Sequence, residues 1–448
     1  MKKEIQEIID IKTKHEEELF KVDSVHHVDV GIKETESTNP DEVFIRVFME
    51  DISNSHLIPK ELEGVQILVT EGKMPVIFGA ESTDTKVLAQ DDSDTINTKA
   101  FYNPVQGGIS VGPSRKINGL YNSGTLGALV RGRSSGLVYG LSNFHVLCAD
   151  DGWKIGDQIM QPAKGNVGST SVGNIVAAHF PGIVGDKGYN VDAAITSILD
   201  RDVSDKCLAL GTLCGSSDPQ LSSTVTKVGK TSGETTGVIT GIKATMKVVS
   251  PLTGKKVTFG NQIVIQPAKG ENAFLEKGDS GSVVVDYANF VVGLLFARRP
   301  DGGGYANEFS NVRKAFDVEV YSNFLVPGLG YLGSYQFGYN IGSYDNKLQH
   351  IEGIPSQAEQ VTLINCKTTG HVSFRNNNGL YLNDNMNFTE EGPATKWIQS
   401  TLITGVFSLK NVQSNKILKT SGWSYGCQVG FEFPPSFATS DTISWTAI

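Results

Sequence analysis

Between about residues 107 and 320 the chain repeats one pattern: short runs of Val, Ile, Leu and Thr, each bounded by Gly, Ser or Asp. Examples of these runs are residues 125–131, 137–142, 238–242, 262–266 and 283–286. Many short strands at turn-limited spacing are typical of β-barrels and β-sandwiches. The 49 glycines of the chain suit tight turns between strands. We therefore expect a mainly β fold.

The chain has 448 residues, which at about 150 residues per domain predicts roughly three domains. We expect an N-terminal α+β accessory unit with a linker at residues 1–100, a β-rich domain at 101–325 and a third domain at 326–448. The linker is placed at residues 81–100, which are polar and acidic and have little to bury.

Within the N-terminal unit, the apolar residues between 3 and 20 recur at a spacing that predicts an amphipathic helix. Residues 22–33, 42–49 and 65–70 alternate between polar and apolar and predict strands. Residues 59–64, with the sequence Pro-Lys-Glu-Leu-Glu-Gly, are expected to form one helical turn.

The formal charge of −9, without a long basic run, argues against a nucleic-acid surface and against binding to an anionic membrane. The N-terminus lacks the apolar stretch of a signal peptide or membrane span. Five widely spaced cysteines suit free thiols in a reducing compartment. We therefore expect a soluble protein in the cytoplasm.

One segment, Lys277-Gly-Asp-Ser-Gly-Ser282, has the residue types that a nucleophile for acyl transfer needs. Glycine at 278 lets the backbone turn so that the amides of Gly278 and Ser280 point at one spot, where an oxyanion would bind. The alternative is an ordinary turn between strands.

A serine hydroxyl needs a base within hydrogen-bond reach, and histidine suits this role at neutral pH. His145 is the candidate, because it follows a predicted strand that ends in the small polar residues Ser142 and Asn143. A structural role is the alternative for a single histidine. Asp192 is the candidate to orient the imidazole, since it lies in an apolar strand where an unpaired carboxylate would be costly.

These motifs resemble the trypsin/chymotrypsin family of serine peptidases, and more narrowly a bacterial and plant branch that includes the Narrow Leaf protease. The resemblance covers about residues 25 to 320 and is carried by five further segments: Ile58-Pro-Lys-Glu-Leu-Glu-Gly64, Pro104-Val-Gln-Gly-Gly-Ile-Ser-Val-Gly112, Gly124-Thr-Leu-Gly-Ala-Leu-Val130, Leu141-Ser-Asn-Phe-His-Val-Leu147 and Val228-Gly-Lys-Thr-Ser-Gly233. It implies a chymotrypsin-like double β-barrel with His145, Asp192 and Ser280 in the cleft between the barrels. The sequence departs from the branch at Phe144 and Ser282.

The resemblance also implies that Phe274, six residues before Ser280, lies at the floor of the primary specificity pocket. No carboxylate stands there, so we expect a preference for small or apolar side chains over Lys or Arg. Arg298 and Arg299 are candidates for the pocket mouth, where they would favour acidic side chains; the alternative is a solvated pair.

Three other patterns carry less chemistry. Gly229-Lys-Thr231 lacks the first glycine and the frame of a phosphate-binding loop. His15 lacks a second histidine one helical turn later, so no metal site is predicted, and no cofactor is needed. Cys148 is expected to be a buried structural cysteine rather than a nucleophile.

Beyond residue 326 the sequence contains two similar strand–turn–strand segments, which begin at Val372 and Phe407, and tryptophans follow at Trp397 and Trp445. A degenerate first copy is expected between Tyr335 and Leu348. The repeats resemble β-trefoil modules of the ricin-lectin kind, which implies a glycan or protein ligand; a stabilising domain without ligand is the alternative.

The sequence thus predicts a serine endopeptidase that acts on protein or peptide substrates. Two other hypotheses stay open: a catalytically silent or gated binding protein on a protease scaffold, and a lectin-like protein. An oligomer is possible. No nucleic-acid or membrane partner is expected.

Overall fold

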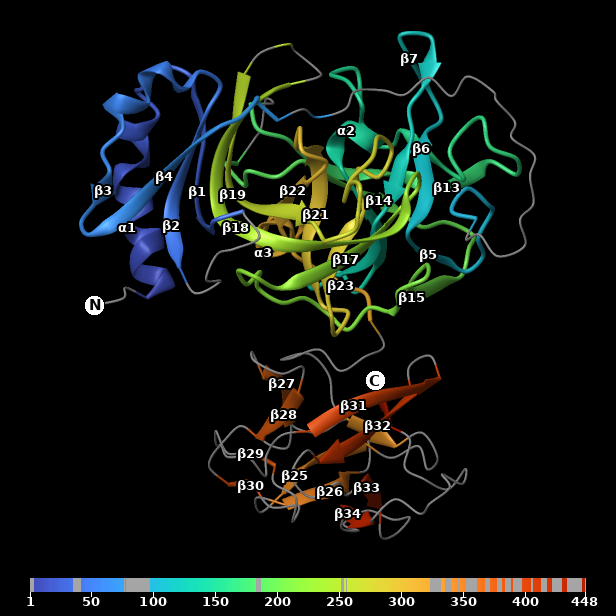
Figure 1. The fold of residues 1–448 in the computed structure, drawn as a ribbon. Coiled ribbons are helices and arrows are strands. Elements are labelled where there is room, and N and C mark those ends of the chain that lie inside the picture. Colours follow the sequence, from blue (N-terminus) through green and yellow to red (C-terminus); the bar gives the residue numbers. More distant parts are fainter. Residues whose placement is uncertain are drawn as a thin grey trace. The chain divides into compact units, whose positions relative to one another are not determined.

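The computed structural model describes residues 4–322, apart from 35–41, 76, 78–96, 183–186, 251–253 and 255, and beyond residue 322 it describes the backbone of strands. Most of the predicted linker, residues 81–96, therefore lies outside the described residues. Two units can be distinguished: residues 1–211 with 216–321, and residues 212–215 with 322–448. The first unit is mainly β, as predicted (Figure 1).

The larger sheet of the first unit has ten strands in the order β17-β20-β21-β22-β19-β18-β1-β2-β4-β3. Its strands are β1 (Val25–Ile32), β2 (Val43–Met49), β3 (Glu61–Leu62), β4 (Val65–Glu71), β17 (Thr224–Gly229), β18 (Gly233–Val249), β19 (Lys256–Pro267), β20 (Val283–Asp286), β21 (Val291–Arg298) and β22 (Gly304–Glu308). Strand β17 also pairs with β18. The six strands from β17 to β22 are therefore paired in a closed ring, as in a β-barrel.

The second sheet has eight strands in the order β23-β10-β11-β14-β13-β12-β6-β9. These are β6 (Ile109–Pro113), β9 (Gly124–Leu126), β10 (Ala128–Gly132), β11 (Val138–Ser142), β12 (Gln158–Gln161), β13 (Thr170–His179), β14 (Ala193–Ser197) and β23 (Val318–Val320). Smaller sheets are formed by β5 (Val105–Gly107), β15 (Val203–Cys207) and β16 (Gly211–Thr212), and by β7 (Lys116–Ile117) and β8 (Leu120–Tyr121). The two large sheets correspond to the expected chymotrypsin-like pair of β-barrels.

The N-terminal residues extend the ten-stranded sheet. Strand β1 pairs with β18, for example His27 with Met246, and β2 pairs with β1 on its other side. Helix α1 (Ile5–Leu19) buries Ile8, Ile11 and Leu19 in the same hydrophobic cluster as β1 and β2, as its amphipathic pattern predicts. The α+β character of this segment is confirmed.

One predicted element of this segment is wrong. Residues 59–64 form no helical turn: Glu61–Leu62 is strand β3, which pairs with β4. The helical turn lies earlier, at the 3-10 helix η1 (Ile52–Leu57), where the Asp51 carboxylate accepts a hydrogen bond from the Ser53 amide. This side-chain cap starts the turn there, and the positive φ angles of Glu63 and Gly64 reverse the chain into β4.

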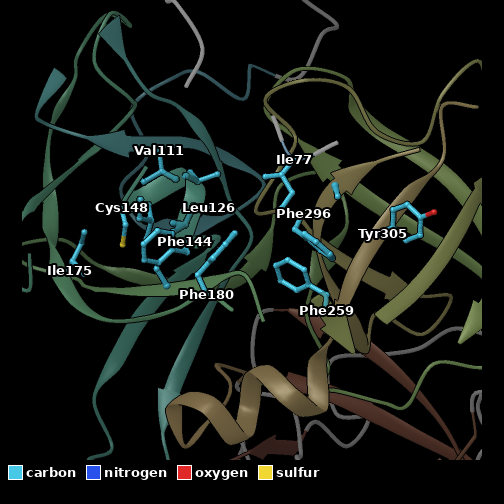
Figure 2. Close-up of a cluster of buried hydrophobic side chains, with 14 of the residues drawn as sticks. Ile77, Val111, Leu126, Phe144, Cys148, Ile175, Phe180, Phe259, Phe296 and Tyr305 are labelled. Atoms are coloured by element: carbon cyan, nitrogen blue, oxygen red, sulfur yellow. The ribbon is translucent and has the colours of Figure 1, made fainter. Parts of the chain in front are cut away.

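Two hydrophobic clusters form the core of the first unit. One includes Leu126 of β9, Phe259 of β19 and Phe296 of β21, so both large sheets contribute to it, together with Phe144 and Phe180; Figure 2 shows these five side chains. The other joins α1, β1 and β2 to the strands around β19. Helices α2 (Phe144–Leu147) and α3 (Phe309–Phe316) complete this unit.

The second unit consists of short strands from β24 (Leu332–Ser334) to β35 (Trp445–Ala447). Both predicted hairpins are confirmed: β28 (His371–Asn376) pairs with β29 (Tyr381–Leu382), and β32 (Val406–Asn411) pairs with β33 (Ile417–Thr420). Strands β25 (Asn340–Tyr344) and β26 (Lys347–Ile351) form a third hairpin in the region of the expected first copy. In the part of the chain that the structure describes, no helix has the length and apolarity to span a membrane.

Candidate active site

His145 lies in the short helix α2, directly after strand β11. The strand ends at Ser142, and Asn143 has extended backbone angles and precedes the first helical residue, Phe144. The His145 side chain is buried. Its backbone carbonyl accepts a hydrogen bond of 2.8 Å from Asn122 Nδ2, so both the strand end and this contact hold the backbone of His145 in place.

Asp192 directly precedes β14 and is brought beside His145 by the pairing of β14 with β11. Its Oδ2 atom lies 2.5 Å from His145 Nδ1, and its Oδ1 atom accepts a hydrogen bond of 3.1 Å from the His145 amide. Two asparagines hold the Asp192 backbone: Asn143 Nδ2 donates to its carbonyl at 2.7 Å, and Asn307 Oδ1 accepts from its amide at 2.9 Å. A fully buried carboxylate with this geometry can fix the imidazole tautomer.

Ser280 lies in a turn that needs glycine on both sides. Gly278 and Gly281 have φ angles of +102° and +93°, which residues with a side chain adopt only under strain. The neighbouring amides of Asp279, Gly281 and Ser282 donate to backbone carbonyls. Among the described residues no acceptor faces the amides of Gly278 and Ser280, and these two donors are the ones expected to bind an oxyanion.

Strand β9 lies beside both the turn at residues 278–281 and helix α2. The Ser280 carbonyl accepts a hydrogen bond of 2.9 Å from the Thr125 amide, and the Gly278 carbonyl accepts one of 3.0 Å from the Thr125 hydroxyl. A Cβ atom added to Gly124 would lie 2.6 Å from Val146 and 2.9 Å from the Ser280 carbonyl oxygen. The residue next to His145 and the backbone of Ser280 therefore meet at one glycine.

Three side-chain atoms at this site are buried without a hydrogen-bond partner in the described part of the chain: Asn143 Oδ1, His145 Nε2 and Ser280 Oγ. An unsatisfied buried polar atom costs about 1–3 kcal/mol, and most buried polar atoms of native proteins do have a partner. Two of the three, His145 Nε2 and Ser280 Oγ, are the atoms that proton transfer in acyl transfer requires. The pair is therefore the feature of the site that demands a chemical explanation.

Asp279, the residue before Ser280, anchors the turn from inside the protein. Its carboxylate is fully buried and accepts hydrogen bonds from Lys227 Nζ at 2.9 Å, from the Thr231 amide at 2.8 Å and from the Ser232 hydroxyl at 2.6 Å. Burial alone would raise the pKa of Asp279, but Lys227 and these hydrogen bonds hold it below its usual range. Sequence reasoning missed this anchor, although Thr231 and Ser232 belong to a motif that it singled out.

The structure places the three pocket candidates differently. Phe274 has no exposed surface and packs in the core against Gly237 and Gly304. It can therefore support the residues that line a pocket but cannot itself contact a substrate. Arg298 is partly exposed and donates from Nε to the Leu275 carbonyl at 3.1 Å. Arg299 fits neither expectation, because it is buried and its guanidinium is held by Glu34 and Asp301.

Cys148 is buried, as predicted, and burial raises the pKa of its thiol well above the usual value. A thiol in this state is a poor nucleophile. No group of three or more His, Cys, Asp or Glu side chains that could hold a metal ion occurs among the residues with described positions.

No protein-family model matches the chain, and no curated protein matches it. Among solved structures it is similar to a glutamic-acid-specific serine protease (17% identity, 48% of this chain and 100% of that chain, TM-score 0.36). It is also similar to Cellulomonas bogoriensis chymotrypsin (18% identity, 48% of this chain and 98% of that chain, TM-score 0.34). The β-trefoil of BEL is similar over 29% of this chain and 100% of its own length (19% identity, TM-score 0.23).

Proposed function

We propose that the protein is a serine endopeptidase with Ser280 as nucleophile, His145 as general base and Asp192 as the residue that orients the base. The observation that carries the proposal is the pair of buried, unpartnered atoms His145 Nε2 and Ser280 Oγ, together with the contact of 2.5 Å between His145 Nδ1 and Asp192. A buried imidazole nitrogen without another partner is suited to take the proton of a buried hydroxyl that also lacks one, as activation of a serine requires.

In the proposed reaction, His145 Nε2 takes the proton of the Ser280 hydroxyl as Oγ attacks the carbonyl carbon of a peptide bond. The amides of Gly278 and Ser280 donate to the oxyanion of the tetrahedral intermediate, and Asp192 stabilises the imidazolium. The imidazolium then donates its proton to the leaving amine, which leaves an ester on Ser280. A water molecule, activated by His145, hydrolyses this ester and restores the free serine.

The organisation predicted from the sequence completes the proposal. The division at residues 100 and 325 makes residues 101–325 the peptidase domain, preceded by an accessory unit and followed by a β-trefoil-like recognition domain for a glycan or protein ligand. Phe274 and Arg298 remain the proposed pocket residues. The proposed compartment is the cytoplasm.

Digestion of a peptide library, with sequencing of the products, tests the proposal. We expect wild-type protein to cut the library at a defined side-chain preference and Ser280→Ala to leave it intact. Ser135→Ala, which changes an exposed serine in the β10–β11 turn, is the matched control and should cut like wild type. Equal cleavage by wild type and Ser280→Ala, or no cleavage by wild type, would favour the silent scaffold instead.

A further inference from the structure

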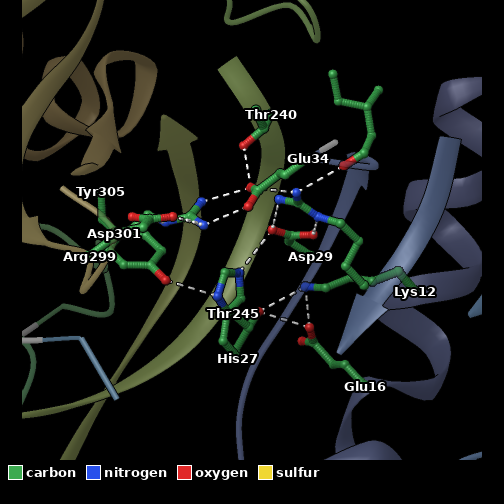
Figure 3. A network of polar contacts seen from close by, with 12 residues as sticks. Lys12, Glu16, His27, Asp29, Glu34, Thr240, Thr245, Arg299, Asp301 and Tyr305 are labelled. Carbon is green, nitrogen blue, oxygen red and sulfur yellow. Dashed lines mark hydrogen bonds and ion pairs between the residues drawn. The ribbon is translucent and has the colours of Figure 1, made fainter. Parts of the chain in front are cut away.

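A buried chain of charges links the N-terminal strands to the turn between β21 and β22 (Figure 3). Asp29 on β1 accepts two hydrogen bonds from Arg46 on β2, at 2.7 and 2.5 Å. Arg46 also donates from Nη1 to Glu34 at 2.8 Å. Glu34 in turn accepts two hydrogen bonds from Arg299, at 2.8 and 2.7 Å. Glu34 therefore bridges an arginine of the N-terminal segment and an arginine 265 residues away.

The bridge is built for an ionised carboxylate. The side chains of Arg46 and Arg299 are 1% and 7% exposed, and that of Glu34 is 18% exposed. Burial acts to raise the pKa of Glu34, but the hydrogen bonds and charge of Arg299, with the charge of Arg46, outweigh it and hold this pKa well below the usual value. Loss of the charge would leave two buried cations without their shared partner, which is costly.

Arg299 uses its remaining hydrogen bonds to close its own turn. Its Nε and Nη2 atoms donate to Asp301 at 3.1 and 2.7 Å, and Asp301 Oδ1 accepts from the Gly303 amide at 3.0 Å. The Arg299 amide donates to the Gly303 carbonyl at 2.9 Å. Hydrogen bonds thus hold residues 299–303 together as one unit. Among the described residues, Glu34 is the only residue outside the turn that forms an ion pair with it.

This turn holds the backbone that leads into the nucleophile. The Gly302 carbonyl accepts a hydrogen bond of 2.8 Å from the Phe274 amide, and the Leu275 carbonyl accepts from Arg298 Nε at 3.1 Å. The next amide, that of Glu276, donates to Asp279 at 3.0 Å. A path of hydrogen bonds, joined by the backbone of residues 299–303 and 274–276, therefore runs from Glu34 to the residue before Ser280.

We propose that Glu34 is a positioning residue for the substrate pocket beside Ser280: it holds Arg299, and through the turn at 299–303 it fixes the backbone at Phe274 and Leu275. The N-terminal segment then contributes to substrate selection without contacting substrate. The kinetic part of this inference rests on the proposed peptidase function. A residue that acts in this way changes KM and side-chain preference more than the acylation of Ser280 by a small probe.

Hydrogen exchange and kinetics of Glu34→Gln test the inference together. Glutamine keeps the shape and removes the charge, so we expect the amides of Phe274, Leu275 and Gly303 to exchange about tenfold faster. KM for a peptide substrate should rise about ten- to hundredfold, since a small displacement of a positioning group has effects of this size, whereas the rate of labelling by a small fluorophosphonate should change less than about threefold.

Two further variants make the test decisive. Arg299→Lys keeps the charge but cannot form the two parallel hydrogen bonds, so it should shift exchange and KM in the same direction as Glu34→Gln, and it serves if Glu34→Gln does not fold. Glu63→Gln is the matched control, because Glu63 is an exposed carboxylate of the same segment that contacts Lys14 and His15; neither readout should move.

Unchanged exchange at Phe274 and Leu275 in a folded Glu34→Gln protein would overturn the inference, as would faster exchange with unchanged KM. If wild-type protein shows no peptidase activity, the proposed function fails, and the exchange measurement alone then decides whether Glu34 holds this backbone.

Discussion

Two buried His–Asp pairs in this protein have similar contacts and different surroundings. In one, His145 Nδ1 lies 2.5 Å from Asp192; in the other, His27 Nε2 lies 2.9 Å from Asp29. The other ring nitrogen of His27, Nδ1, contacts the Tyr305 hydroxyl at 3.2 Å, and the ring stacks on Phe48 with a centroid distance of 4.4 Å. The free nitrogen of His145 has no partner among the described residues.

The carboxylates differ as well. Asp29 accepts two hydrogen bonds from Arg46, whereas Asp192 accepts from the amide and ring of His145. Burial alone would raise the pKa of Asp29, but Arg46 and His27 hold it below its usual range; burial lowers the pKa of His27 despite Asp29. A His–Asp pair is therefore structural when every polar atom is satisfied, and it can act as a base only where one nitrogen is left for a substrate.

The largest expected effect separates the two histidines. His145→Ala should lower the rate of peptide hydrolysis by about 10⁴- to 10⁶-fold, because the Ser280 hydroxyl loses its base. His27→Gln should keep the rate per folded molecule within about threefold of wild type, since the change is confined to a structural pair. Rates measured with the amount of folded protein determined by circular dichroism check both values. Comparable losses in the two variants would remove the distinction between the pairs.

Substitution of Asp192 should reduce catalysis, whereas substitution of Asp29 should reduce stability. Asp192→Asn should reduce kcat by about 10⁴-fold with little effect on folding, because an amide stabilises the wrong tautomer of His145 and cannot stabilise an imidazolium. Asp29→Asn should instead leave kcat per folded molecule nearly unchanged and lower the melting temperature, since Arg46 loses its counter-charge. An equal fall of kcat in both would contradict the comparison.

Removal of Arg46, the cation beside the structural pair, should act mainly on stability. Arg46→Met removes the buried arginine that Asp29 and Glu34 share and leaves Asp29 with His27 and Glu34 with Arg299, and the free energy of unfolding should fall by about 3–5 kcal/mol. Urea unfolding measures this change. Lys21→Met, which breaks the exposed contact with Glu18, is the control and should have little effect. A small effect of Arg46→Met would mean that the charge chain is not needed for folding.

The smallest expected effect is a pH dependence beside the structural pair. Burial lowers the pKa of His26 from 6.5 to about 4, although its ring contacts the Gly72 carbonyl at 2.8 Å. Between these values the unfolded chain binds a proton that the folded chain does not, so stability falls as the pH drops from about 6.5 to about 4, by on the order of 2 kcal/mol. His26→Gln should flatten the pH profile of urea unfolding by this amount. His56→Gln, a change at an exposed histidine, should leave the profile unchanged.

Local patterns were sufficient to predict most elements of the first unit and the residues of the candidate site. The alternation of residues 42–49 predicts β2, and glycine at 278 predicts the backbone turn before Ser280, where Gly278 has a positive φ angle. Each of these features depends on neighbours in sequence. The contact between His145 and Asp192 was predicted because an apolar strand makes an unpaired carboxylate costly.

Features that depend on distant pairing could not be predicted in this way. Nothing in residues 25–32 indicates that β1 pairs with β18, because the register is set by the partner strand. Lys227 and Arg299 look like solvated residues in the sequence, yet their partners, Asp279 and Glu34, place both in the interior. The 3-10 helix at Ile52–Leu57 was missed because the sequence from Pro59 to Gly64 was interpreted as the helical turn instead.

Reaction with a fluorophosphonate, followed by intact mass and peptide mapping, tests the reactive pair most directly. We expect one adduct per chain, on Ser280, with no adduct in Ser280→Ala and a rate reduced at least about 10³-fold in His145→Ala. This result would show that the unpaired imidazole nitrogen activates the unpaired hydroxyl. Folded protein that forms no adduct, or an adduct on another residue that persists in Ser280→Ala, would contradict the account.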